Sequence, residues 1–199
     1  MTKNRLEAFS DAVIAIVITI MVLELAVPHD DSWGAFRDSV PGLAVYALSF
    51  VFLAIYWNNH HHLLHASERV NGRILWANMH LLFWLSLVPF VTAWMTESDF
   101  HATPVAVYGV VLILAAIAYY VLQAQILVAH GPTAKLRAAL AHDVKGKVSP
   151  LLYAIAIPAA YVTIWISLGL YIFVALMWLV PDPRIESLYQ EIDADSSAS

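Results

Sequence analysis

Apolar side chains run along most of this chain in long blocks, and short polar stretches separate the blocks. Five blocks are clear, and they cover residues 12–27, 40–64, 74–95, 105–129 and 151–180. An α-helix needs about 20 apolar residues to cross the hydrocarbon core of a bilayer, which is roughly 30 Å thick. Each of the first four blocks therefore predicts one membrane-spanning helix.

The fifth block is too long for a single span, because as one helix it would measure about 45 Å. A turn near Ser167 to Gly169 would divide it into two short helices, whereas Pro158 leaves open one long, kinked and tilted helix. We favour six helices over five. Their approximate ranges are 5–27, 40–64, 73–95, 104–129, 148–166 and 168–181.

The pattern thus predicts an all-α, polytopic membrane domain over residues 1–181, followed by a short acidic tail over 182–199. Composition agrees, since 61% of the residues are hydrophobic and only 13% are charged, too few to cover a soluble domain of 199 residues. The net charge of −5 and the dispersed basic residues exclude a nucleic-acid-binding surface. The absence of cysteine excludes disulfides, thiolate nucleophiles and cysteine-ligated metals.

Basic residues fall almost entirely on one side of the predicted membrane. All but Arg37 lie at the N-terminus, in two alternate loops or near the C-terminus. Because Lys and Arg in short loops favour the cytoplasm, we expect a multi-pass protein with both termini and the tail in the cytoplasm. Asp11 interrupts the first apolar block early, so we expect a retained helix there rather than a cleaved signal peptide.

Asp11 is also the first candidate functional residue. It lies six residues past Arg5, about 9 Å inside the first predicted helix, where an unpaired carboxylate is unfavourable. The polar residues at a similar depth in the second and third helices are His60, His61, Asn78 and His80. We favour a polar network that fixes the first helix against its neighbours. The alternative is an ordinary aspartate that reaches toward the membrane interface.

A histidine cluster at residues 60–62 and 65 closes the second predicted helix, and His61 and His65 share one helix face. Imidazoles at that spacing bind metals, and membrane metalloenzymes use such pairs. Those enzymes need several histidine boxes, and this chain has one. We therefore expect no enzyme and no metal site, and interpret the cluster as a hydrated helix end.

A narrow stripe along the first helix is formed by Ile16, Thr19, Ile20 and Leu23, which follow the spacing i, i+3, i+4 and i+7. Asp11 lies about 140° around the helix from Ile16, so the two side chains face different surroundings. An apolar stripe with one hydroxyl group lines either a helix-packing seam or a pore. Periodicity alone favours the seam.

The start of the first helix resembles the R-x-x-x-F-S-D signature of the transmembrane protein 175 family. The matching residues are Arg5, Phe9, Ser10 and Asp11, followed by Thr19 and Glu24. A second match, Trp76-Ala77-Asn78 followed by residues 87–92, is similar to the third helix of bacterial members. The resemblance covers nearly the whole chain.

This resemblance implies a potassium-permeable channel in a bacterial inner membrane. It implies a homotetramer of six-helix subunits in which the first helix lines a central pore, with the bilayer, other copies and potassium ions as partners and no cofactor. Ile16 then matches the constriction, Ile20 and Leu23 further apolar layers, and Thr19 the position associated with potassium preference. The signature residues brace the first helix, and their candidate partners are Trp57, His61, Asn78 and His80.

Such a pore would gate by dewetting at four isoleucine side chains and would prefer potassium over sodium only modestly, because hydroxyls and water replace the usual ring of carbonyls. Acidic residues on the outer side either concentrate cations at the mouth or merely solubilise the loops. These residues are Glu24, Asp30, Asp31, Asp38, Glu97 and Asp99. The alternatives are a proton- or ion-coupled transporter and, less favoured, a histidine-cluster metalloenzyme.

Overall fold

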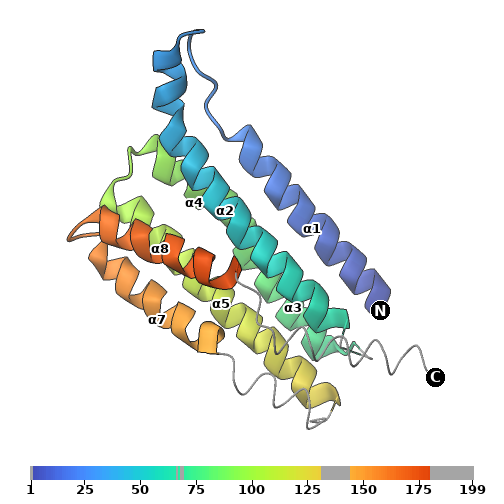
Figure 1. Cartoon of the computed structure of the whole chain (residues 1–199). Helices are drawn as coiled ribbons and strands as arrows, with labels where there is room; N and C mark the ends of the chain where they lie inside the picture. The colour runs from blue at the N-terminus through green and yellow to red at the C-terminus, as the bar shows by residue number, and fades with distance from the viewer. Residues whose placement is uncertain (1, 66, 68–69, 131–143, 180–199) are drawn as a thin grey trace.

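The computed structural model describes residues 2–65, 67, 70–130 and 144–179, and all regular elements among them are helices (Figure 1). The helices are α1 (Lys3–Leu23), α2 (Trp33–His65), α3 (Gly72–Ser86), α4 (Val88–Glu97), α5 (Ala102–His130), α7 (Val144–Ala159) and α8 (Ile164–Leu179). The all-α prediction is confirmed. The predicted acidic tail at 182–199 lies outside the described residues.

Four stretches are long and apolar enough to cross a membrane, and α8 is apolar but shorter. The four are Lys3–Leu23, Trp33–His65, Gly72–Glu97 and Ala102–Ala129. The third contains both α3 and α4, which are separated only at Leu87. Pro89 follows this break and has no N–H to donate, so the backbone ladder is interrupted there.

Local capping places two helix ends away from the predicted boundaries. The first helix ends at Leu23 rather than near residue 27, where Pro28 disfavours a helical conformation in the residue before it. The second begins at Trp33 rather than near residue 40, because the Ser32 hydroxyl accepts a hydrogen bond of 3.1 Å from the Ala35 N–H and caps the helix.

The turn in the fifth apolar block lies at residues 160–163, so its predicted position near Ser167 to Gly169 is wrong. Pro158 lacks a backbone donor, and α7 ends one residue later at Ala159. Ser167 lies inside α8, where it is buried and donates to the Ala156 carbonyl at 2.7 Å. The Ala156 carbonyl also accepts from the Ala160 N–H at 3.1 Å, so Ser167 is its second donor and joins α8 to the last turn of α7.

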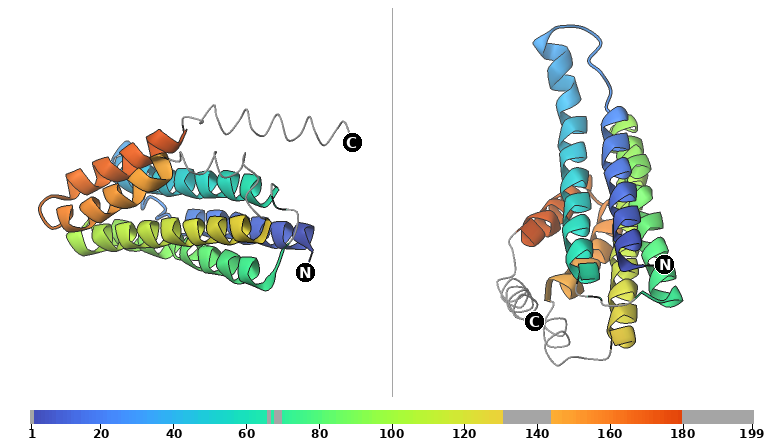
Figure 2. Two further views of the ribbon diagram at one scale, coloured as in Figure 1. Left: turned by 90° about the horizontal axis from the view of Figure 1, so that it is seen from below. Right: turned by 90° about the vertical axis from the view of Figure 1, so that its right-hand side faces the viewer.

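The spanning helices lie side by side along one axis, and α7 and α8 form a hairpin against α5 and α2 (Figures 1 and 2). Helix α5 contacts α3, α4, α7 and α8 and occupies the centre of the bundle. Gly109 on α5 permits close approach of α8, since a Cβ there would overlap the Tyr171 hydroxyl. That hydroxyl instead donates to the Val105 carbonyl at 3.0 Å.

Hydrogen bonds between helices also hold the buried centre. The Ser49 hydroxyl on α2 lies 2.8 Å from that of Thr92 on α4 and 2.9 Å from that of Tyr108 on α5. All three residues are buried. Such contacts tie membrane helices together where the surrounding lipid is as apolar as the side chains.

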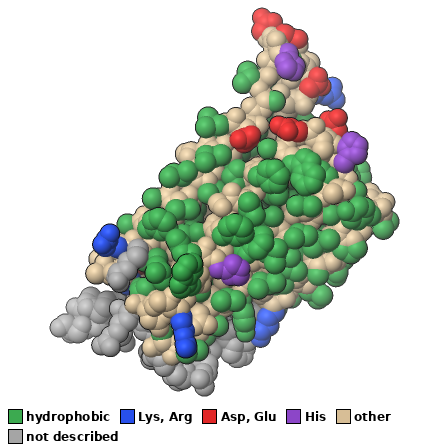
Figure 3. Space-filling view, turned by 180° about the vertical axis from the view of Figure 1, so that it is seen from behind, with side chains coloured by type: hydrophobic (Ala, Val, Ile, Leu, Met, Phe, Trp, Pro, Cys, Tyr) green, Lys and Arg blue, Asp and Glu red, His purple; other side chains and the backbone are tan. Residues whose placement is uncertain are grey.

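The outer surface has the distribution of a membrane protein. Hydrophobic side chains cover the middle of the face shown in Figure 3, and charged side chains lie toward its two ends. Large exposed apolar residues of the subunit include Trp76, Phe90 and Trp165, all more than 60% exposed. An apolar belt between charged ends fits a chain that contacts lipid.

Candidate functional site

Helix α1 presents two different faces. Its buried face, formed by Leu6, Ser10, Ile14, Val17 and Met21, packs against the bundle. The stripe predicted from the sequence lies on the uncovered side, where Ile16 is 57%, Ile20 40% and Leu23 79% exposed, and Thr19 is exposed as well. The stripe is therefore exposed on the described part of the subunit.

A groove of about 680 Å³ separates α1 from α4 beside this stripe. Ile16 and Ile20 form part of its α1 wall, and Phe90 and Trp94 part of its α4 wall. Glu24 and Glu97 lie at its acidic end. Large apolar side chains therefore line both walls of the groove.

The Thr19 hydroxyl has a defined orientation. Its oxygen lies 3.0 Å from the Ala15 carbonyl and 2.9 Å from the Ile16 carbonyl, so its hydrogen points back into the helix. A hydroxyl has one donor and two lone pairs. With the donor used, the exposed side of Thr19 presents only lone pairs, which suit a cation and not an anion.

The signature serine belongs to a buried hydrogen-bond chain that links three helices. The His60 Nε2–H donates to Asn78 Oδ1 at 2.7 Å, and Asn78 Nδ2–H donates to Ser10 Oγ at 2.9 Å. Ser10 in turn donates to the Leu6 carbonyl at 2.8 Å. His60, Asn78 and Ser10 are at most 1% exposed. Because an amide oxygen only accepts, this chain fixes the proton of His60 on Nε2.

Asp11 forms a separate contact nearer the surface. The Trp57 indole N–H donates to Asp11 Oδ1 at 2.9 Å, which joins α1 to α2. The His61 ring stacks on Trp57, with centroids 6.0 Å apart. The structure thus gives the signature two sets of partners, a buried one for Ser10 and a half-exposed one for Asp11.

Three predicted members lie outside these contacts. His80 is exposed and accepts a hydrogen bond of 2.9 Å from the Trp84 indole on its own helix. Arg5 and Phe9 are exposed on α1, and Phe9 is 43% exposed. Of the residues proposed as partners, Trp57 and Asn78 bond signature residues directly, and His61 contacts Trp57. His80 instead bonds within its own helix.

His60 is the buried histidine, although His61 was the candidate partner. Its position follows the buried face of α2, since Leu53 lies seven residues earlier and is fully buried. The spacing in the sequence places His60 on the same face of α2 as Leu53, and the structure shows that this face is buried. Among the described residues, no group of three or more metal-ligating side chains is close enough to hold an ion.

An acidic cavity adjoins the far end of the stripe. It is lined by Glu24, Asp30, Asp38, Glu97 and Asp99, and Glu24 also lines the groove between α1 and α4. Hydrogen bonds from the Ser32 hydroxyl and backbone N–H lower the pKa of Asp30 below its ordinary value, so this carboxylate stays ionised. Negative charge therefore gathers at one end of the exposed α1 face.

Several known proteins are similar to this chain in sequence. Residues 5–89 match the family described as "Endosomal/lysosomal potassium channel TMEM175". A protein from Chryseobacterium sp. (strain P1-3) named as a potassium channel is 49% identical over 96% of this chain and 100% of its own length. One from Chamaesiphon minutus, also named as a potassium channel, is 30% identical over 87% of this chain and 91% of its own.

A solved structure shares the fold. It is described as the crystal structure of a lysosomal potassium-selective channel TMEM175 homolog from Chamaesiphon minutus. The match has a TM-score of 0.74 and 27% sequence identity, and covers 89% of this chain and 96% of that one. The alignment includes nearly all of both chains.

Proposed function

The chain belongs to the TMEM175 potassium channel family, and on that premise we propose that it forms a potassium-permeable pore lined by α1. The family is one of ion channels, so the chain is a membrane channel and not an enzyme. The observation that carries the pore assignment is the uncovered stripe of Ile16, Thr19, Ile20 and Leu23. A single subunit leaves it exposed, and symmetry-related copies would turn it toward a shared axis.

In the proposed assembly four copies surround that axis in a bacterial inner membrane, with both termini in the cytoplasm. The groove between α1 and α4 supports this arrangement, because it offers apolar walls to a neighbouring helix. Ile16 forms a narrow dry neck, and Ile20 and Leu23 form further apolar layers. The acidic cavity beside Glu24 lies at the outer mouth and attracts cations.

Selectivity is proposed to be modest. The sequence has no T-V-G-Y-G segment to supply a ring of backbone carbonyls. The outward lone pairs of Thr19 and nearby water are the groups available to replace an ion's hydration. The buried Ser10, Asn78 and His60 chain and the pair of Asp11 with Trp57 lie off the stripe and hold α1 against α2 and α3.

Reconstitution of the purified full chain in liposomes tests the function. With a potassium gradient in solutions free of sodium and no proton gradient, we expect unitary currents that reverse near the potassium equilibrium potential. Currents or flux that appear only with an imposed proton gradient would instead indicate a coupled transporter. Absence of any potassium conductance from correctly assembled protein would overturn the proposal.

Substitution of Thr19 by valine is expected to reduce the preference for potassium, because it keeps the side-chain shape and removes the oxygen. The permeability ratio of potassium to sodium, obtained from bi-ionic reversal potentials, should move toward one. The matched control is Thr103→Val near the start of α5, an exposed threonine that lines neither the groove nor the acidic cavity. If Thr19→Val leaves the ratio unchanged, discrimination arises elsewhere.

A further inference from the structure

A second groove, of about 510 Å³, lies on the surface of the subunit between α3 and α5. It shares no lining residue with the groove between α1 and α4. Both helices belong to candidate membrane spans, Gly72–Glu97 and Ala102–Ala129. The lining residues are Gly72, Arg73, Trp76, Ala77 and His80 from α3, and Val121 and Gln125 from α5.

This groove begins where both spans end and runs inward along them. Helix α5 is antiparallel to α3, so the start of α3 lies beside the end of α5 (Figure 1). At 1.5 Å per residue, Arg73 lies about 2 Å from the end of its span, and Trp76 and Gln125 lie about 6 Å inside. His80 and Val121 lie about 12 Å inside. The groove therefore extends from the membrane interface into the hydrocarbon region.

The polar side chains of the groove offer hydrogen-bond donors. Arg73 is exposed, and its guanidinium has no partner among the described residues. The Trp84 indole donates to His80 Nε2 at 2.9 Å, so a neutral His80 carries its proton on Nδ1 and presents a second donor. None of the described lining residues is acidic. A guanidinium beside further N–H groups suits the oxygens of an anion and not a cation.

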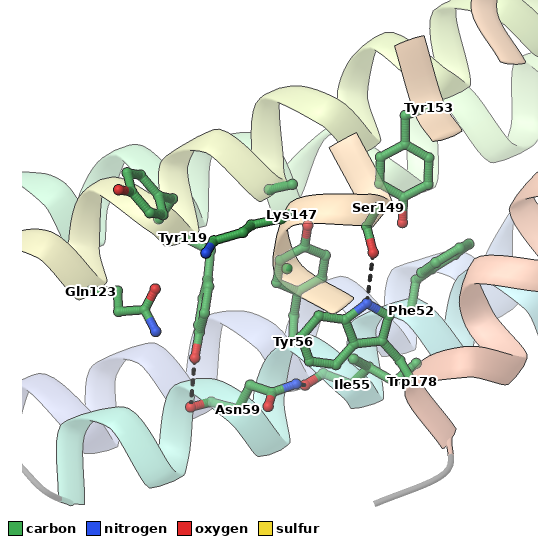
Figure 4. Close-up of a pocket in the computed structure, with 13 residues that line it drawn as sticks. Phe52, Ile55, Tyr56, Asn59, Tyr119, Gln123, Lys147, Ser149, Tyr153 and Trp178 are labelled. Carbon is green, nitrogen blue, oxygen red and sulfur yellow. Dashed lines mark hydrogen bonds between the residues drawn. The ribbon is translucent and has the colours of Figure 1, made fainter. Parts of the chain in front are cut away.

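The Gln125 amide adds another donor on the surface side of α5. Gln123, two residues earlier, lines the internal cavity between α2, α5 and α7 that Figure 4 shows. Two residues turn a helix by about 200°, so Gln125 points away from that cavity, into the groove beside α3. Its amide has no partner among the described residues. An amide at this depth in a bilayer is unfavourable unless an oxygen accepts its N–H.

Trp76 gives the groove an aromatic wall. Its side chain is 76% exposed, although it belongs to a membrane span. Tryptophan favours the interface between membrane and water because its ring is apolar and its N–H is polar. A matching ligand has an anionic group near Arg73, further oxygens near His80 and Gln125, and hydrocarbon at the deeper end beside Val121.

We propose that this groove binds an anionic phospholipid of the bilayer. Arg73 pairs with its phosphate, and His80 Nδ1–H and the Gln125 amide donate to the ester oxygens. The occupant is a lipid rather than free phosphate because the groove extends into the hydrocarbon region. Basic pockets between membrane helices bind such headgroups in general. The inference depends on the membrane location of α3 and α5 and not on the proposed pore.

The test uses the full chain in a neutral detergent and follows its thermal unfolding midpoint. Short-chain phosphatidylglycerol, phosphatidylcholine of the same chain length and inorganic phosphate are titrated separately. Phosphatidylglycerol alone should raise the midpoint in a saturable way, because a ligand of the folded state stabilises it. Arg73→Gln should weaken its apparent affinity at least about tenfold and Gln125→Leu about threefold, the effects of a lost charge-assisted and a lost neutral hydrogen bond.

Two matched controls lie outside the groove. Lys3→Gln removes a positive charge at the end of α2, where the Lys3 ammonium donates to the His65 carbonyl at 2.7 Å. Gln123→Leu removes an amide from the same helix but from a different cavity. Neither change should alter the affinity for phosphatidylglycerol. Arg73→Gln should leave the lipid-free midpoint unchanged, because its side chain has no described partner to lose.

Several results would contradict this lipid site. The proposal fails if phosphatidylcholine or inorganic phosphate raises the midpoint equally, or if Arg73→Gln binds phosphatidylglycerol like the parent. It also fails if Lys3→Gln weakens binding as much as Arg73→Gln does, since the effect would then be one of total charge. Absence of any response to phosphatidylglycerol would leave the groove to another occupant, such as a second copy of the chain, and would overturn the proposal.

Discussion

Replacing Ile16 with asparagine is expected to raise basal potassium conductance at least about tenfold, which equals about 1.4 kcal/mol of the barrier to permeation. Asparagine is polar and no larger than isoleucine, so water can persist in a neck that four isoleucine side chains would keep dry. Assembly should survive, because Ile16 is 57% exposed and lies outside the buried core of its subunit. Macroscopic and single-channel currents of the reconstituted protein measure the change.

Val22→Asn is the matched control for this prediction. Val22 lies on the same helix and is 47% exposed, but it points about 120° away from Ile16. The same polar change there should leave conductance close to that of the parent. If Ile16→Asn and the parent conduct and select alike, α1 does not line the constriction and the pore assignment is wrong.

Replacing Asn78 with alanine is expected to lower the free energy of unfolding by about 2–4 kcal/mol, because it leaves the buried His60 Nε2–H without an acceptor and Ser10 without its donor. Those bonds connect α1 with α2 and α3, so less assembled protein should be recovered as well. Unfolding in detergent and size-exclusion chromatography measure the two effects.

Asn59→Ala controls for the loss of an asparagine. Among the described residues, the Asn59 side chain donates to the Ile55 carbonyl of its own helix, at 2.8 Å, and its removal should cost less than about 1 kcal/mol. Asn78→Ala channels that do assemble should keep the parent's potassium-to-sodium ratio, since Asn78 is buried off the stripe. A stable Asn78→Ala variant with altered selectivity would instead place the hydrogen bonds of His60, Asn78 and Ser10 in the ion path.

The apolar blocks of the sequence determined the spanning helices. A membrane helix satisfies its own backbone hydrogen bonds, so the length of an apolar run is enough to identify it. The apolar pattern did not determine where each helix begins and ends. Ser32 caps α2, so this helix begins before its apolar block does. The R-x-x-x-F-S-D segment at Arg5 to Asp11 indicated the family, and the comparisons confirmed it.

Contacts between side chains determined where the turn lies and which partner each polar residue has, and the apolar pattern did not predict these. Ser167 looked like part of a turn, but its bond to the Ala156 carbonyl keeps it inside α8. His80 had the right depth to meet Asp11 and instead bonds Trp84 on its own helix. Depth along a helix follows from residue number, whereas the direction of a side chain depends on the neighbour that covers it.

The same limit applies to the α1 stripe. Ile14 and Ile16 are chemically identical and two residues apart, yet Ile14 is 1% and Ile16 57% exposed. In water, periodicity reveals the buried face of a helix because the outer face must be polar. In a bilayer both faces are apolar, so the tertiary structure alone decided which side of α1 packs inward.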